Sequence, residues 1–335
     1  MIKIAILNYP NALKSALYGL EEMFLLANGI IEEEALDKPS LNEKPLNDPA
    51  VSKTQTLFDI DLIDWQSIEQ DSHQSKQYQG VIIPPNLGSS FYLEHSQENQ
   101  LNQDSPLNQW LIQQHQNGAI LSSACAGAFI LANTGLLDRR PVTTHWQLSQ
   151  KLKDYCPETK VEEDKILIND KDIITAGGLM AWLDLGLELV SVLACPTLMR
   201  QLGKQLVVDT GHREQAYYQV FKPNKHTDSS VLTCQHFIHM HYQKTIKIAE
   251  LAELTHLTER TLLRRFQKVL ALSPSDYLQH TRIQKACDLL ESSNLSMETI
   301  AIEVGYSDTS AYRKAFNHKM GLSPSQFRQR FGKKI

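Results

Sequence analysis

Cysteine is scarce in this sequence, since its 335 residues contain only five. The five are odd in number and scattered, without paired spacing: Cys125, Cys156, Cys195, Cys234 and Cys287. This set argues against a disulfide framework and against a zinc site, and it is typical of a protein kept in a reducing compartment. We therefore expect a cytoplasmic protein with no metal and no cofactor.

Long hydrophobic runs are also missing. The most apolar stretch, Leu179 to Ala194, carries Asp184 and Glu188, so we interpret it as a buried helix and not a membrane span. The first ten residues lack the charged region, long apolar region and cleavage site of a signal peptide. We expect no membrane association.

The net charge of −5 conceals an asymmetry. Residues 231–335 hold 15 Lys and Arg against 9 Asp and Glu, a net +6, which leaves 18 against 29, a net −11, for the rest. A basic C-terminal module on an acidic body suits a protein that meets phosphates at one end. Chance segregation of solvated surface charge would give the same numbers, so charge alone does not decide the function.

The first 200 residues alternate strand and helix patterns. Strands are predicted at Ile2–Leu7, Val81–Ile83, Ile120–Leu121, Ile166–Ile168 and Ile173–Thr175, and helices at Lys14–Asn28, Pro106–Asn117, Ala126–Asn133 and Leu179–Ala194. This alternation predicts an α/β domain, a mostly parallel sheet with helices on both faces. The polar segment from Glu32 to Thr56, with three prolines, is interpreted as a surface insertion.

A second change of pattern lies near Gly211. Residues 206–230 are rich in turn-forming types and are predicted to be a linker. Beyond them only helical patterns occur. We therefore predict an α/β domain over 1–205 and an all-α domain over 231–335.

The C-terminal region repeats itself at a distance of fifty residues. Leu272-Ser273-Pro274-Ser275 recurs as Leu322-Ser323-Pro324-Ser325, and each copy follows a phenylalanine, Phe266 or Phe316, by six positions. Ahead of each phenylalanine the pattern predicts a short helix, a tight turn and a second helix. The second helices are expected at Thr258–Lys268 and Ser307–Lys319. These are two helix-turn-helix units.

The residue types fit this geometry. Gly305 can adopt positive φ in the second turn, and Thr258 and Ser307 are the expected N-caps of the second helices. The expected buried contacts are those of Leu262 and Phe266 with Leu251 and Ala252, and those of Tyr312 and Phe316 with Ile300 and Ala301.

The outward side chains of the second helices are suited to DNA. Arg bridges guanine edges, while Ser, Thr and Lys reach base edges or phosphates. The candidate DNA-binding residues are Arg260, Arg264, Thr309, Ser310, Arg313 and Lys314. A helical bundle with an ordinary basic face is the alternative, and the matched repeat favours the DNA-binding interpretation.

Residues Thr245 to Phe331 resemble the DNA-binding domain of the AraC/XylS family, through Gly305-Tyr306-Ser307-Asp308 and the closing Gly321-Leu322-Ser323-Pro324-Ser325. The resemblance implies a long helix, here Pro274 to Leu290, joining the two units, which enter adjacent major grooves of promoter DNA. His256 stands where the family usually has a small residue. Histidine tolerates the left-handed region better than most residues, so we expect adaptation there.

The N-terminal domain carries a possible reactive pair. Residues 118–129 predict a strand, then Cys125 on a sharp turn, then a helix whose N-terminus would lower the pKa of the thiol. His145, in Thr144-His145-Trp146, is a possible general base, and Glu22 on the first helix could reach the same sheet edge. Alternatively, Cys125 is a buried small residue and His145 a core histidine.

Met1 to Lys204 resembles the PfpI-like, class I glutamine amidotransferase-like fold, through the Cys125 turn, residues 136–138 and 143–146, and Ile174-Thr175-Ala176-Gly177-Gly178. Catalytic members have two glycines forming an oxyanion hole after the strand that matches Val81–Ile83. This chain has Pro84-Pro85-Asn86 there, and proline lacks the N–H donor. The resemblance therefore implies a vestigial or sensor pocket at Cys125, His145 and Glu22, and no enzyme.

Two hypotheses remain. In the first, the chain is a sequence-specific transcriptional regulator whose α/β domain binds a small metabolite as its effector. The expected partners are double-stranded promoter DNA, this effector, RNA polymerase, and a second copy of the chain through the N-terminal domain. In the second, Cys125 and His145 form a cysteine-dependent amidase fused to a DNA-binding module. A redox role for Cys125 is a further variant, although no resolving cysteine lies nearby in the sequence.

Overall fold

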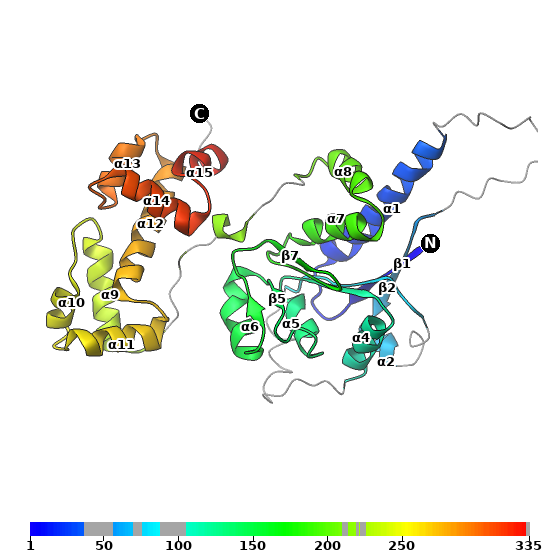
Figure 1. Cartoon of the computed structure of the whole chain (residues 1–335), viewed down its shortest axis with the longest axis horizontal. Helices are drawn as coiled ribbons and strands as arrows, with labels where there is room; N and C mark the ends of the chain where they lie inside the picture. The colour runs from blue at the N-terminus through cyan, green and yellow to red at the C-terminus, as the bar shows by residue number, and fades with distance from the viewer. Residues whose placement is uncertain are drawn as a thin grey trace, which may run out of the picture. The chain divides into compact units, whose positions relative to one another are not determined.

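The protein consists of two compact units, Met1–Gln215 and Ala216–Ile335 (Figure 1). The structure, a computed structural model, describes residues 1–36, 56–69, 76–87, 105–209, 214–218, 221 and 226–332. Most of the polar segment predicted to be a surface insertion lies outside these residues. The division between the units falls inside the stretch predicted to be the linker.

A six-stranded sheet forms the centre of the N-terminal unit, in the order β2-β1-β3-β4-β8-β7. Neighbouring strands are parallel except for β7, which pairs with β8 antiparallel. The strands are β1 Ile2–Asn8, β2 Phe58–Asp64, β3 Gly80–Ile83, β4 Ile120–Ala124, β7 Leu167–Asp170 and β8 Ile173–Ala176. β5 Pro141–Val142 and β6 Lys160–Val161 form a separate two-stranded parallel sheet. The mostly parallel sheet confirms the predicted fold class.

Helices cover both faces of the sheet, as Figure 1 shows. One side carries α1 Lys14–Leu36, α7 Trp182–Leu193 and α8 Pro196–Gln205. The other side carries α2 Trp65–Glu69, α4 Pro106–Gln116 and α5 Gly127–Ala132. A 3-10 turn, η1 Trp146–Leu148, leads into α6 Ser149–Tyr155.

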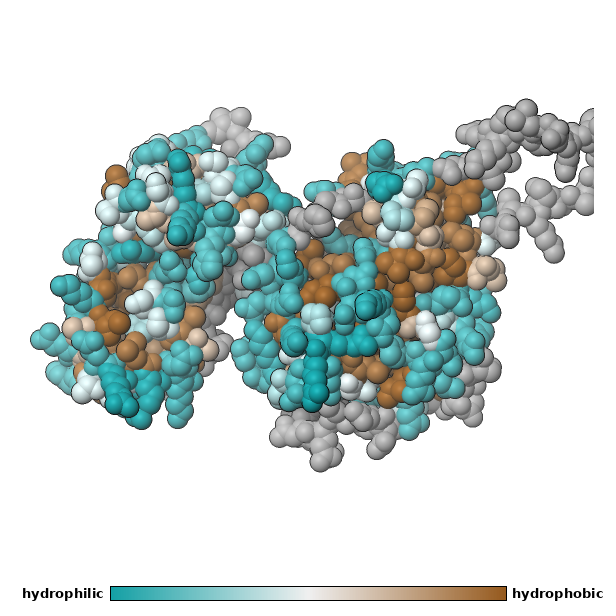
Figure 2. Space-filling view, in the orientation of Figure 1, coloured by the Kyte–Doolittle hydropathy of each residue, from teal (hydrophilic) through white to brown (hydrophobic). Residues whose placement is uncertain are grey.

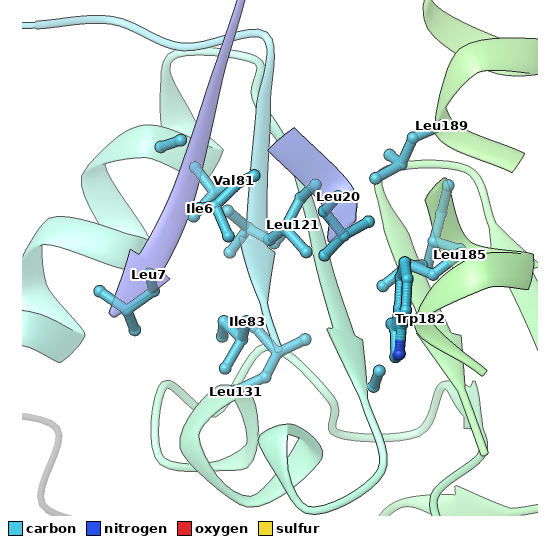
Figure 3. Close-up of a cluster of buried hydrophobic side chains, with 14 of the residues drawn as sticks. Ile6, Leu7, Leu20, Val81, Ile83, Leu121, Leu131, Trp182, Leu185 and Leu189 are labelled. Atoms are coloured by element: carbon cyan, nitrogen blue, oxygen red, sulfur yellow. The ribbon is translucent and has the colours of Figure 1, made fainter. Parts of the chain in front are cut away.

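The core of this unit is packed from both sides of the sheet. Central strand residues such as Ile6, Val81 and Leu121 are fully buried. Figure 3 shows Leu20, Trp182, Leu185 and Leu189 gathered on one side of them, while Leu131 of α5 lies on the other. Burial on both faces explains why the central strands are continuous apolar runs in the sequence.

Several parts of the N-terminal unit were not predicted. β2 is an edge strand whose partly exposed positions include Asp59 and Asp61, so its apolar signal is interrupted by charge. The first helix was predicted to end at Asn28, with the insertion starting at Glu32, but α1 continues to Leu36. Its Glu, Ala and Leu residues favour helix strongly enough to extend it. The helices α2, α6 and α8 and the short strands β5 and β6 were also missed.

The C-terminal unit is all-helical in its described residues. After the short η2 turn, Gln215–Tyr218, come α9 Ser229–His241, α10 Ile248–Leu254, α11 Glu259–Leu270, α12 Pro274–Ser292, α13 Met297–Glu303, α14 Thr309–Met320 and α15 Pro324–Phe331. It contains two separate hydrophobic cores, and α12 contributes to both, with Tyr277 in the first and Ile283 and Leu290 in the second.

The expected contacts of the two helix-turn-helix units are present. Leu262 and Phe266 share a core with Leu251 and Ala252. Tyr312 and Phe316 share the other with Ile300 and Ala301. No described helix is both long and apolar enough to cross a membrane.

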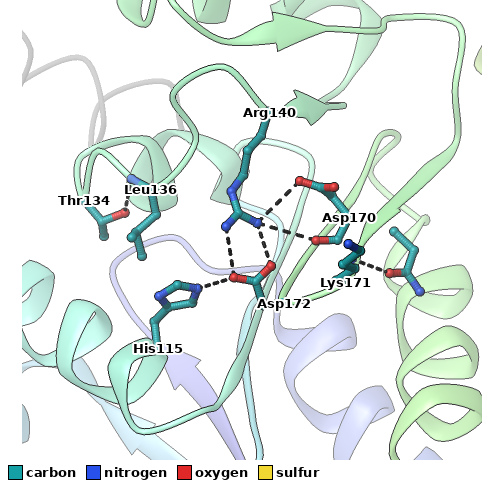
Figure 4. A network of polar contacts seen from close by, with 8 residues as sticks. His115, Thr134, Leu136, Arg140, Asp170, Lys171 and Asp172 are labelled. Carbon is teal, nitrogen blue, oxygen red and sulfur yellow. Dashed lines mark hydrogen bonds and ion pairs between the residues drawn. The ribbon is translucent and has the colours of Figure 1, made fainter.

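A polar network closes the amino-terminal end of the sheet (Figure 4). Asp172, directly before β8, accepts hydrogen bonds from both terminal nitrogens of Arg140, at 2.7 and 3.0 Å, and its Oδ2 lies 2.6 Å from Nε2 of His115. These contacts hold the pKa of the Asp172 carboxyl well below its usual range, chiefly through the hydrogen bonds from Arg140. The network ties the end of α4 to the start of β8, at the edge opposite Cys125.

Asp172→Asn should lower the free energy of unfolding of the N-terminal unit by about 1 kcal/mol at pH 7, because Asp172 is 43% exposed and its charge is partly screened. Since the pKa is depressed in the folded state, this stabilisation is complete above the unfolded value of about 3.9 and is lost as the pH falls toward the folded value. Urea unfolding at pH 7 and pH 3 should show the difference shrinking in acid. The exposed Asp138→Asn is the control, and equal stabilities of Asp172→Asn and the parent at pH 7 would contradict the role of the network.

Candidate DNA-binding surface and carboxyl-edge site

The first helix-turn-helix unit consists of α10 and α11. The chain reverses through His256, whose φ of 52° lies in the left-handed region, as expected from the tolerance of histidine for it. The backbone N–H of Leu257 donates to the carbonyl of Ala252 over 2.9 Å. Thr258 caps α11 by accepting from the backbone N–H of Thr261 at 3.2 Å, as predicted.

The second helix-turn-helix unit consists of α13 and α14, and its turn is one residue longer than the turn of the first. Gly305 has a φ of 88°, and a Cβ there would lie 2.7 Å from the carbonyl oxygen of Gln243, so the position requires glycine. The predicted N-cap, Ser307, is wrong. Asp308 caps α14, and its carboxylate accepts from the backbone N–H groups of Ser310 and Ala311 at 3.1 and 2.8 Å.

The second helix of each helix-turn-helix unit, α11 or α14, is called its recognition helix here. The longer turn changes which residues of α11 and α14 occupy corresponding positions. Counted from the caps, Arg260 corresponds to Ser310, Arg264 to Lys314, and Leu263 to Arg313. The side chains of Arg260, Arg264, Ser310, Arg313 and Lys314 are exposed, and that of Thr309 is partly exposed. Arg313 forms a 3.5 Å ion pair with the exposed Glu298. The six predicted residues therefore lie on the two recognition helices.

Sequence reasoning missed three further residues on these faces. Leu263 is 37% exposed although it is apolar, and Gln267 and Asn317 are exposed one turn further along their helices. Leucine can contact a thymine methyl group, and glutamine and asparagine can pair with an adenine edge. The helical spacing was the signal that could have found them, because Leu263 and Gln267 lie three residues after Arg260 and Arg264, and Asn317 lies four residues after Arg313.

An arginine of α12 holds the two helix-turn-helix units in a fixed arrangement. Arg282 donates from Nε to the carbonyl of Tyr242, at 2.8 Å, and from a terminal nitrogen to that of Lys244, at 2.9 Å. Its guanidinium lies 5.4 Å from the ring centre of Tyr306 in the second turn. The loop between α9 and α10 is thus tied to the turn of the second unit.

The second candidate site lies at the carboxyl ends of the parallel strands. Cys125 follows β4 directly and has a φ of 53°, a strained conformation for a residue with a Cβ. Its backbone N–H donates to Ala176 at the end of β8, and its carbonyl accepts from the Thr144 hydroxyl over 2.7 Å. The structure therefore joins the Cys125 turn to the loop that carries His145.

The expected activation of Cys125 is contradicted. Cys125 is 5% exposed, and burial raises the pKa of its thiol to about 11. A hydrogen bond from the Ala126 backbone lowers this pKa but does not offset the desolvation. Burial also lowers the pKa of His145, whose Nδ1 accepts from the backbone N–H of Gln147 at 3.1 Å. Nδ1 is therefore occupied as a cap of η1, and among the described residues no hydrogen bond joins His145 to Cys125.

Glu22 does not join this pair. Its side chain is exposed in a surface groove of α1 that Gln205 of α8 also lines. No hydrogen bond of the described residues links it to Cys125. In the strand end that matches the oxyanion position, the Pro85 carbonyl accepts from the Leu13 N–H at 2.7 Å, and Tyr9 donates from its hydroxyl to the Pro84 carbonyl. No group of three or more His, Cys, Asp or Glu residues in the described chain could hold a metal ion.

Comparisons with known proteins identify both units. Residues 251–330 match the helix-turn-helix domain model HTH_18, and residues 94–192 match the DJ-1/PfpI family. The HTH-type transcriptional regulator CdhR of Pseudomonas aeruginosa is 27% identical over 280 residues, which cover 81% of this chain and 83% of CdhR.

Two solved structures are also similar. The C-terminal domain of the response regulator AraT of Geobacillus stearothermophilus is 27% identical, with a TM-score of 0.32, over 33% of this chain and 92% of that one. Drosophila melanogaster DJ-1beta is 16% identical, with a TM-score of 0.42, over 62% of this chain and 98% of that one.

The fold, the two recognition helices and the matching sequences define the class of protein: a helix-turn-helix transcriptional regulator with a second, α/β domain. More narrowly, the chain combines a DJ-1/PfpI domain at its N-terminal side with a helix-turn-helix domain of the AraC type at its C-terminal side.

The reassigned cap can be tested within α14. Asp308→Ala should lower the opening free energy of the first amides of α14 by about 1 kcal/mol, because two backbone N–H groups lose their acceptor. Ser307→Ala, one residue earlier, should leave it nearly unchanged. Native-state hydrogen exchange of the full chain measures both. A larger loss in Ser307→Ala would restore the original assignment.

Proposed function

We propose that this chain is a sequence-specific regulator that reads promoter DNA with α11 and α14. One observation carries the proposal: two capped helices of twelve residues each bury one face in separate cores and expose polar and basic side chains on the other. An ordinary helical bundle with a basic face does not require its caps, cores and exposed faces to repeat together. Arg260, Arg264, Thr309, Ser310, Arg313 and Lys314 are the residues that we expect at the DNA.

We propose further that the α/β domain binds a small metabolite at the carboxyl edge of its sheet. The ends of β1, β3, β4 and β8 meet there, where ligands of parallel α/β sheets are commonly held. The raised pKa of Cys125 and the occupied Nδ1 of His145 favour a binding pocket over a catalytic pair. The cysteine-dependent amidase is therefore the second candidate.

Further partners belong to the same proposal. A homodimer through the N-terminal domain is supported by Leu25 and Leu26 on α1, which are 52% and 38% exposed. Figure 2 shows hydrophobic side chains gathered on this part of the unit. RNA polymerase is the partner expected of a regulator at a promoter. We place the regulator in the cytoplasm with its DNA.

DNA reading is tested by alanine substitution in each recognition helix. Arg264→Ala and Arg313→Ala should each relax base preference by about 1–3 kcal/mol, at two places in the promoter about one helical turn, ~34 Å, apart. Binding of the full chain to its own upstream DNA should weaken steeply with salt, because phosphate contacts release counterions.

Affinity titrations against variant promoter sites measure both effects. Lys285→Ala, an exposed change on α12 outside the recognition helices, is the control. The absence of specific binding at low salt would overturn the proposed function. A uniform loss over all DNA sequences would instead assign the two arginines to phosphate contacts.

The catalytic alternative is tested with Cys125→Ser. We expect ammonia release from glutamine and small amides to stay at background in both proteins, because a thiol with a pKa near 11 is protonated at neutral pH. Specific DNA binding should be unchanged in the variant. Turnover in the parent that disappears in Cys125→Ser would establish the amidase and remove the binding-pocket interpretation.

A further inference from the structure

Gln215, the last residue of the N-terminal unit, is held by the loop that carries His145. Its side chain is 2% exposed. The amide nitrogen lies within hydrogen-bond distance of the Thr143 hydroxyl, at 3.1 Å, and of the carbonyls of Thr144 and Lys165, both at 2.8 Å. The amide oxygen accepts from the Trp146 backbone N–H at 3.1 Å. Residues 143–146 therefore bind both the nitrogen and the oxygen of the Gln215 amide, and Lys165 also binds the nitrogen.

The site that holds the Gln215 side chain, called its seat below, is connected to the carboxyl-edge site. It has room for this one side chain. Thr144, whose carbonyl accepts from Gln215, donates its hydroxyl to the Cys125 carbonyl. A Cβ on Gly177, at the end of β8, would lie 1.8 Å from the amide nitrogen of Gln215, so only glycine leaves room for it. A change in the Cys125–His145 loop therefore alters the seat of Gln215.

The residues that follow are held by the C-terminal unit, at the end of the second recognition helix. Only Ala216 separates Gln215 from Tyr217. The Tyr217 ring lies 3.2 Å from where a Cβ of Gly321, the C-cap of α14, would stand, and the Arg330 guanidinium lies 5.3 Å from its centre. The Tyr218 ring contacts Phe331 edge-on, with centroids 5.4 Å apart.

A third aromatic residue contacts the same helix through a histidine. Phe221 stacks on His280 of α12, with ring centroids 4.5 Å apart, and its backbone N–H donates to Gln284. The Nζ of Lys319, near the end of α14, donates to Nε2 of His280 at 3.1 Å. Burial lowers the pKa of His280 to about 4, so its ring is neutral and can accept at neutral pH.

We propose that Gln215, Tyr217 and Tyr218 form a coupling segment that transmits the state of the Cys125–His145 loop to the second recognition helix, α14. Gln215 senses the loop, and the two tyrosines act on the end of α14. The chain between them is short: in a 3-10 turn it rises about 2 Å per residue, so little slack absorbs a displacement of Gln215. The inference rests on the proposed function, because it names how that site regulates DNA reading.

Gln215→Met tests the coupling in the full chain, since methionine keeps the length of the side chain and removes its hydrogen bonds. Hydrogen–deuterium exchange should rise about fivefold or more, the low end for coupled sites, in residues 143–146 and also in 314–331. A merely local role would change only residues 143–146. Gln147→Met, an exposed glutamine of the same loop, is the matched control and should change neither region.

Coupling is reciprocal, so the reverse experiment is independent of the first. Tyr217→Ala should raise exchange in residues 143–146, which lie in the other unit, and circular dichroism reports whether each variant is folded. If Gln215→Met unfolds the domain, the Tyr217→Ala result decides alone. Unchanged exchange in 143–146 in Tyr217→Ala, or unchanged exchange in 314–331 in a folded Gln215→Met, overturns the proposal.

The same proteins are titrated with the upstream DNA. Specific DNA binding by the parent without exchange coupling would leave the proposed function intact and remove only the coupling segment. If the parent protein does not bind the upstream DNA specifically, the proposed function itself is wrong. In the coupled case, Gln215→Met should change affinity for the part of the promoter that Arg313→Ala affects, and not for the part that depends on Arg264.

Discussion

The arrangement of the DNA-binding domain depends on one helix shared by two cores. The nineteen residues of α12 span about 28 Å, at 1.5 Å per residue, and they enter the first core near one end and the second near the other. Each half of the domain is too small to hold its recognition helix independently of this helix. The offset between α11 and α14 is therefore set by the length of α12, with Arg282 fixing the loop and the turn beside its middle.

Much of the fold could be predicted from the sequence, because its strongest signals are local. Strands buried on both faces appear as apolar runs, and β1, β3, β4 and β8 were found in this way. β2 was not, because an edge strand can carry aspartates on its partly exposed positions. The N-cap of α14 was misplaced for a different reason: Ser307 and Asp308 are both good caps, and only the backbone shows which of them begins the helix.

The chemistry of the carboxyl-edge site was less predictable. The position of Cys125 on a turn after a strand follows from the sequence, but the state of its thiol depends on how deeply the surrounding elements bury it. Burial is the sum of many distant contacts, and it reversed the expected direction of the pKa. The seat of Gln215 was equally invisible, since its partners Thr143, Thr144 and Lys165 lie 50 to 72 positions away in the chain.

The distribution of thiols has a practical consequence. Cys125, Cys156, Cys234 and Cys287 are buried, and Cys195, the N-cap position of α8, is exposed. A maleimide dye or spin label would thus attach at one place on the native molecule without any engineered cysteine. That place lies in the N-terminal unit, whereas the recognition helices belong to the C-terminal unit. A reporter there would follow the motion of one domain against labelled DNA, so the two halves of this regulator can be tracked separately in an unaltered chain.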